Sequence, residues 1–330
     1  DCTLESATLA RQWLLQMATA AENNGLTVQY CMSWPRHMLQ SVEFQAVTQA
    51  RVSKDYHPGN DQWRVGVTSI FADAIGVTPT KDNFWSTSTE EGRYGKDFEP
   101  YPELQAAVST LSAGPVAPSD AIGRSDVKLI MRSARADGKL LRPERPARML
   151  DSAIRSVAFA SKDTPALGDI WATTSLVSGL PFAQVIAAGS QPHNLTHTEL
   201  FPCPRSPLRF LAFESSDPFH TIRSFSESEP IHLPATNQST FVLWTLAPVM
   251  FNGWTFLGEA TSKWVAVSPV RFSQISVSST GLSIVVSGAP GEAVELAAVN
   301  PSGEPSIFTC EIPEAGTIKA VFPDAACVSV

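Results

Sequence analysis

Polar side chains follow each of four short apolar runs in the first half of the chain. Cys31 follows the first run, Arg51 and Asp55 the second, Asp82 the third and Asp120 the fourth. In a parallel β/α array the carboxyl ends of the strands lie at one edge, which is where such folds build their active sites. We therefore expect these side chains to share one edge of a sheet.

Two tryptophans, Trp34 and Trp85, stand beside these polar groups. A sugar stacks its apolar ring faces on indole and bonds its hydroxyls to acids, so this mixture suits a carbohydrate. Simpler interpretations stay open. Both tryptophans can belong to the core, Asp55 can be a solvated loop acid, and Arg51 can pair with a surface carboxylate.

Helical and strand-like patterns alternate through the first half of the chain. Apolar residues at helical spacing precede Asn24-Gly25, a helix stop, and the same rhythm then repeats. This alternation predicts a parallel sheet, either open or closed into a barrel. The expected helices are Leu4–Asn23, Met38–Gln49, Asp61–Gly76, Pro102–Leu111 and Asp126–Ala134, and the expected strands are Leu26–Met32, Ala50–Ser53, Lys81–Trp85 and Gly114–Ser119.

The pattern changes near residue 148. Short alternating runs separated by Gly, Pro, Ser and Asn follow, which indicates an antiparallel β-sandwich over 149–330. Residues 1–148 hold four strand-like units, whereas a complete eight-stranded barrel needs about 250 residues. The expected fold is thus α/β plus all-β. The longer expected strands are Asp169–Val177, Phe182–Ala187, Phe210–Phe213, Phe241–Leu246, Lys263–Val267, Gly281–Ser287 and Ala293–Val299.

The five cysteines show no CxxC pair or zinc-like spacing, which favours disulfides over a metal site. Cys310 and Cys327 lie in two short β-like runs, Ser306–Ile312 and Thr317–Val330. If these runs pair as neighbouring strands, the two sulfurs come close together. We therefore expect a disulfide between them.

Two triplets, Asn194-Leu-Thr196 and Asn237-Gln-Ser239, have the form of N-glycosylation acceptors. Together with the cysteines they favour a secreted protein or a lysosomal-type compartment over the cytosol. His193 and His197 stand four residues apart, but Pro192 argues against the helix that a zinc site of this spacing needs, and we expect no metal.

Composition and motifs exclude several classes of binding partner. The 330 residues carry a formal net charge of −8, which excludes binding to nucleic acid through a basic surface. No apolar run approaches the roughly 20 residues of a membrane span. The sequence also has no phosphate-binding loop and no dinucleotide fingerprint, so no cofactor is expected.

Five segments resemble, in order, motifs of the clan of retaining α-galactosidases, which includes raffinose synthases, alkaline α-galactosidases and lysosomal α-galactosidases. The second is similar to Arg-Ala-Ser-Asp-Asp-Phe-Tyr-Pro, the third to Asp-Met-Phe-His-Ser and the fourth to Gly-Pro-Val-Tyr-Val-Ser-Asp of that clan. The segments are Tyr30–Pro35, Arg51–Pro58, Asp82–Ser86, Gly114–Asp120 and Ala136–Pro143, and they are spread over a span of about 110 residues.

The resemblance implies a retaining mechanism, in which two carboxyl groups roughly 5–5.5 Å apart protonate the leaving oxygen and attack the anomeric carbon. It implies that Asp55 is the general acid/base and that Arg51 binds a sugar hydroxyl near the reacting carbon. Asp82 would accept a hydrogen bond from substrate, and Trp34 would shape the pocket. The other substrate-binding candidates are Cys31, Trp85 and Asp120.

The family nucleophile lies on a strand that precedes the Leu4–Asn23 helix. The resemblance therefore implies the C-terminal half of a (β/α)8 barrel, with Asp1 an internal or processed start and the nucleophile on an N-terminal segment. We expect an N-terminal fragment of the same precursor, or a second chain, to complete the barrel. Lys54 replaces an acid of the relatives, so the alternative is a catalytically inactive carbohydrate-binding or structural protein that keeps the fold.

Overall fold

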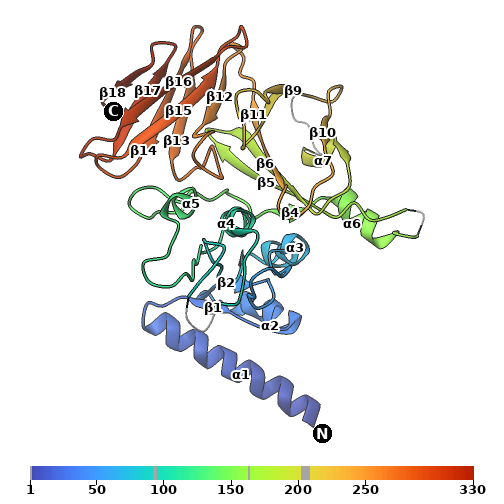
Figure 1. Cartoon of the computed structure of the whole chain (residues 1–330). Helices are drawn as coiled ribbons and strands as arrows, with labels where there is room; N and C mark the ends of the chain where they lie inside the picture. The colour runs from blue at the N-terminus through green and yellow to red at the C-terminus, as the bar shows by residue number, and fades with distance from the viewer. Residues whose placement is uncertain (1, 92–94, 163, 202–208) are drawn as a thin grey trace.

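The computed structural model describes residues 2–91, 95–162, 164–201 and 209–330, with side chains from Thr8 onward. It is a mixed α/β structure with a small parallel sheet and several antiparallel sheets (Figure 1). None of the described helices is long and apolar enough to cross a membrane.

The first half contains a three-stranded sheet in the order β1-β2-β3, with both strand pairs parallel. Its strands are β1 (Val28–Tyr30), β2 (Val47–Arg51) and β3 (Thr78–Thr80). Beyond β3, Phe84 forms a single parallel bridge to Pro118. Because the strands are parallel, all three carboxyl ends lie at one edge, as the sequence predicts.

Helices connect these strands, and α1 lies at the end of the molecule away from the antiparallel sheets (Figure 1). Helix α4 begins at Pro102 with Glu103 in its first turn, a favourable start because proline needs no N–H partner there and the acid complements the helix dipole. The helices are α1 (Cys2–Asn23), α2 (Pro35–Gln40), α3 (Gly66–Ala74), α4 (Pro102–Leu111) and α5 (Val127–Met131), with a 3-10 turn at Ser41–Glu43.

Several expected bounds in this half are wrong. The helix expected over Met38–Gln49 ends at Gln40, because Val47 and its neighbours form a parallel strand against β1. The helix expected from Asp61 begins only at Gly66. The third strand lies just before the expected Lys81–Trp85, and of that range only Phe84 makes a bridge.

A six-stranded antiparallel sheet, in the order β4-β5-β6-β11-β8-β9, begins the second half. The β5–β6 turn is Ser178-Gly179, whose φ angles of 53° and 76° fit a type I′ hairpin. The strands are β4 (Arg148–Met149), β5 (Asp169–Val177), β6 (Leu180–Ala188), β8 (Phe210–Glu214), β9 (Arg223–Phe225) and β11 (Val242–Pro248). A small pair, β7 (His193–Leu195) and β10 (Ile231–Leu233), and helices α6 (Asp151–Ala158) and α7 (His197–Leu200) accompany the sheet.

Both faces of this sheet are buried. Trp171 and Ile186 pack in a cluster with helix α4 of the first half. Ile170 and Val185, which point to the other face because strand side chains alternate, pack with β7 and β10. The sheet therefore connects the β/α half to the rest of the chain.

The last part of the chain is a sandwich of a three-stranded and a four-stranded sheet around one hydrophobic core. The expected strand Lys263–Val267 is wrong, because this segment bends and Trp264 N donates to the carbonyl of Arg132 at 3.1 Å instead of to a neighbouring strand. The strands are β12 (Thr255–Gly258), β15 (Ala293–Val299) and β16 (Pro305–Glu311), and β13 (Phe272–Val277), β14 (Leu282–Ser287), β17 (Thr317–Phe322) and β18 (Ala326–Val328).

The expected disulfide between Cys310 and Cys327 is present. The reason given for it is wrong, since β16 and β18 belong to different sheets and the bond joins the two layers of the sandwich. Cys31 is a free, exposed thiol. Cys203 and the side chain of Cys2 lie outside the described residues.

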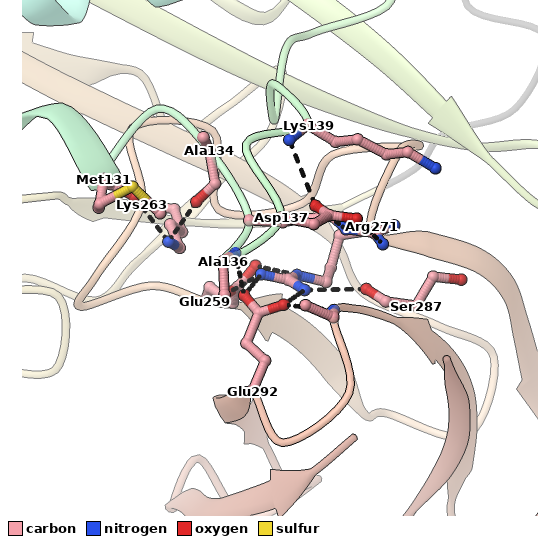
Figure 2. A network of polar contacts seen from close by, with 12 residues as sticks. Met131, Ala134, Ala136, Asp137, Lys139, Glu259, Lys263, Arg271, Ser287 and Glu292 are labelled. Atoms are coloured by element: carbon pink, nitrogen blue, oxygen red, sulfur yellow. Dashed lines mark hydrogen bonds and ion pairs between the residues drawn. The ribbon is translucent and has the colours of Figure 1, made fainter. Parts of the chain in front are cut away.

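A buried ionic network joins the sandwich to the segment after α5 (Figure 2). Arg271, which has no exposed side-chain surface, lies 2.9 Å from Glu259 and 2.5 Å from Glu292. The backbone N–H of Ala136 donates to Glu292 at 3.1 Å. Lys263 donates to the carbonyl of Met131, the last residue of α5, and to that of Ala134, at 2.7 Å each. The two halves are thus connected by charged groups as well as by apolar packing.

Candidate active site at the carboxyl edge of the parallel sheet

Arg51, the last residue of β2, connects the ends of two strands. Its Nη2 donates to Asp55 Oδ1 at 2.5 Å and its Nη1 to Asp82 Oδ2 at 3.1 Å. Arg51 faces Thr80 of β3 in the parallel register, so the residues that follow the two strands start at the same level. The structure therefore brings Arg51, Asp55 and Asp82 together.

Asp82 is held by the protein's own donors. Besides the bond from Arg51, its Oδ2 accepts the backbone N–H of Tyr56 at 2.8 Å, and its Oδ1 accepts that of Asn83 at 2.9 Å. Its own N–H donates to Ser53 Oγ at 2.9 Å. Only 18% of the Asp82 side chain is exposed. Asp82 thus fixes the loops that follow β2 and β3.

Asp55 has a different environment. Its side chain is 56% exposed, and among the described residues only Arg51 binds it. The neighbouring Lys54 binds Asp61 at 3.1 Å, so that cation is engaged by another carboxylate. A ligand hydroxyl can therefore reach Asp55 from solvent.

A buried lysine lies beneath this edge. Lys81 is 3% exposed, and its Nζ donates to the carbonyls of Asp82 at 3.1 Å and Asn83 at 3.0 Å. The ammonium also lies 5.3 Å from the ring centres of Tyr56 and Phe84. Burial lowers the pKa of Lys81 to about 7, against the opposing effect of Glu99 and Asp82.

Tyr56 and Glu99 complete this buried layer. The Tyr56 hydroxyl donates to Glu99 Oε2 at 2.8 Å and accepts the N–H of Trp85 at 3.1 Å. Burial raises the pKa of Tyr56, and the nearby Glu99 raises it further. Sequence reasoning gave no role to Lys81, Tyr56 or Glu99. The available signal was that Lys81 and Tyr56 each adjoin a candidate aspartate.

The remaining candidates lie around this centre in different ways. Trp34 is exposed, whereas Trp85 is buried and meets the Tyr56 ring edge-on at 6.2 Å, so its indole belongs to the core. Cys31 follows β1 at the same edge and is exposed. The described contacts connect neither Trp34 nor Cys31 to Arg51.

The expected strand Gly114–Ser119 is wrong, since only Pro118 of that range makes a bridge, and Asp120 holds this segment against the loop after β3. Its two oxygens accept the N–H of Ser86 at 2.6 Å and the Ser86 hydroxyl at 2.7 Å. Nearby, Ser119 Oγ donates to Asn83 Oδ1 at 2.9 Å. Asp120 therefore supports the loop that carries Asp82.

The other sequence features lie in the antiparallel part. Asn194 and Asn237 are both exposed, Asn194 on β7 and Asn237 in a turn closed by its own side chain. His193 binds Glu199 at 2.9 Å, while His197 is buried among phenylalanines.

The accessible carboxylate of Asp55 thus lies beside the guanidinium of Arg51. Beneath them lies the buried layer of Lys81, Tyr56 and Glu99. Asp55 can exchange a proton with a bound ligand, and Arg51 can donate to a ligand hydroxyl. No protein-family model matches this chain, and no curated protein matches it.

Proposed function

We propose that this protein is a glycoside hydrolase or transglycosidase of α-galactosidase type that uses a retaining double displacement. The observation that carries the proposal is the bridge from Arg51 to Asp55 and Asp82 at the carboxyl edge of a parallel sheet. These three residues belong to the second and third of the segments that resemble the α-galactosidase clan.

In this proposal Asp55 is the general acid/base, since it is the accessible carboxylate of the three-residue group. Arg51 turns one of its donors from Asp55 to a sugar hydroxyl when substrate binds. Exposed Trp34 offers a ring face to the sugar. Retention of configuration needs a second carboxylate as nucleophile.

Asp82 does not suit the role of nucleophile, because protein donors already bind both of its oxygens. We propose that the nucleophile comes from an N-terminal fragment of the same precursor, or from a second chain, that adds to the sheet at β1. Among the described strands β1 pairs only with β2, which leaves one edge for such a partner. A cleft of about 390 Å³ between α1 and β1, lined by Trp13, Met17 and Tyr30, also supports a partner segment at β1.

In this proposal residues 1–148 are the C-terminal half of a (β/α)8 barrel, and the added segment completes it. The three parallel strands and the parallel bridge from Phe84 to Pro118 support a fourth unit beside β3. The test is turnover of an aryl α-galactoside by the full-length protein and its Asp55→Asn variant. Loss of turnover in the variant supports the proposal, and full activity ends it.

A second candidate is a carbohydrate-binding protein without catalysis. Two observations favour it: protein donors already bind both oxygens of Asp82, the other carboxylate of the bridge, and Lys54 stands beside Asp55. Saturable binding of an α-galactoside by a full-length protein that never turns it over would select this candidate.

We also propose a secreted or lysosomal-type location. The disulfide and the exposed Asn194 and Asn237 support it. Protein from a eukaryotic secretory host should lose mass on treatment with peptide N-glycosidase, and an unchanged mass would count against glycosylation at either site.

A further inference from the structure

A second cleft, of about 930 Å³, lies between the β/α half and the antiparallel half. Its walls come from the loop after β3, from the start of α4, from α5, and from the loops that follow β8 and β12. None of Arg51, Asp55 and Asp82 lines it. The cleft is therefore a feature separate from the candidate active site.

The lining of this cleft is rich in hydroxyl groups and balanced in charge. Seven of the lining residues are Ser or Thr, and Pro102 and Leu129 are the only apolar ones. The charged residues are two acids, Glu103 and Asp126, and two bases, Lys128 and Arg132, so the formal charges cancel. An apolar ligand and a strongly anionic ligand both fit this lining poorly.

Arg132 is the best-oriented donor in the cleft. Its guanidinium stacks on Trp264 at 3.4 Å from the ring centre, which fixes its plane. Its Nε is buried and has no partner among the described residues, and no described carbonyl or side chain accepts from its guanidinium. A fixed guanidinium with unused donors matches two adjacent hydroxyls of a ligand.

Glu103 supplies the complementary acceptor. It lies at the exposed start of α4, near enough to Arg132 to influence its ionisation, and it accepts no hydrogen bond within the described ranges. A guanidinium donor and a carboxylate acceptor on one wall, facing Ser216 and Ser262 on the other, suit a ligand whose surface is made of hydroxyls.

We propose that this cleft is a binding site for a neutral oligosaccharide, with Arg132 and Glu103 bonding vicinal hydroxyls of one sugar unit. Ser86 lines the cleft and also binds Asp120, so the site adjoins the loop that carries Asp120. The proposal stands whether or not Asp55 is catalytic, because no candidate catalytic residue takes part in it.

The test is calorimetric titration of the full chain with maltotriose, a neutral oligosaccharide that has vicinal hydroxyls and no α-galactosyl unit, as the probe. Glu103→Gln and Arg132→Lys should each weaken binding about tenfold or more, because each removes part of a charged hydrogen bond. Lys54→Met, at an exposed residue that does not line the cleft, should leave this binding in place. An unchanged melting temperature in Glu103→Gln controls for folding, since Glu103 is exposed.

Three results would overturn the proposal. They are the absence of saturable maltotriose binding, binding that neither cleft variant weakens, and binding of inorganic phosphate where maltotriose gives no signal. Because the probe is not an α-galactoside, the outcome at the cleft and the outcome of the turnover test are measured separately, and the two proposals can fail independently.

Discussion

Asp55 and Asp82 bind the two terminal nitrogens of one guanidinium, at 2.5 Å and 3.1 Å from Arg51. The two carboxylates are nevertheless unequal. Asp82 also accepts two backbone N–H groups, whereas Asp55 has Arg51 as its one described partner and is three times as exposed, 56% against 18%. A ligand that competes for Arg51 will therefore displace Asp55 and leave Asp82 in place.

This inequality predicts different stability effects for the two carboxylates. Asp82→Ala should lower the free energy of unfolding by about 2–3 kcal/mol, because it leaves charged and backbone donors without an acceptor. Asp55→Ala should cost less than about 1 kcal/mol, as expected for a solvent-exposed ion pair. Urea unfolding of both variants checks this, and equal losses would mean that Asp55 also holds the fold.

Lys81 predicts a specific dependence of stability on pH. Its pKa is about 7 in the folded chain, against 10.5 for the ordinary group. Between these values the unfolded chain binds a proton that the folded chain has lost, so raising the pH from 7 to 10 stabilises the folded state. Below pH 7 both states carry the proton, and the cost of burying the charge is fully present.

Replacing Lys81 by methionine isolates its contribution to the pH dependence of stability. In Lys81→Met the rise in unfolding free energy between pH 7 and pH 10 should be smaller than in the wild type. Lys54→Met, which removes an exposed lysine bound to Asp61, should keep the wild-type slope. The same slope in Lys81→Met and the wild type would show that Lys81 stays charged in the folded chain.

The network in Figure 2 predicts a large effect of losing its central cation. Arg271→Leu leaves Glu259 and Glu292 buried without their partner, and it should lower the unfolding free energy by about 3–5 kcal/mol. Arg124→Leu removes an exposed pair with Glu91 and should cost under about 1 kcal/mol. Similar midpoints for the two variants in denaturant would contradict a structural role for the network.

Local patterns predicted some of these features well. Helix α4 has the expected bounds, because Pro102 sets its start and its apolar residues recur at helical spacing. The meeting of Arg51 with Asp82 follows from parallel strands, since each residue lies at or just after a strand end. The Cys310–Cys327 disulfide was predicted, but its position across two sheets depends on tertiary packing that a single run does not reveal.

Long-range contacts explain what the sequence did not predict. The buried layer joins Lys81 and Tyr56 to Glu99, which comes from a segment without regular periodicity. The Met38–Gln49 segment has a helical pattern, yet its last residues join β2 because Val47 pairs with Val28 of β1. In both cases the deciding interaction is made by residues distant in sequence, which local propensity does not encode.

The most direct test of the proposed glycosidase activity is the kcat for an aryl α-galactoside of the full-length protein, its Asp55→Asn variant and an Asp61→Asn control. Asp61 is a half-exposed carboxylate in the same loop as Asp55, and its ion-pair partner is Lys54. We predict turnover by the wild type and the control, and a loss of at least about 100-fold in Asp55→Asn, as for removal of a general acid/base. Full activity in Asp55→Asn would contradict the assignment.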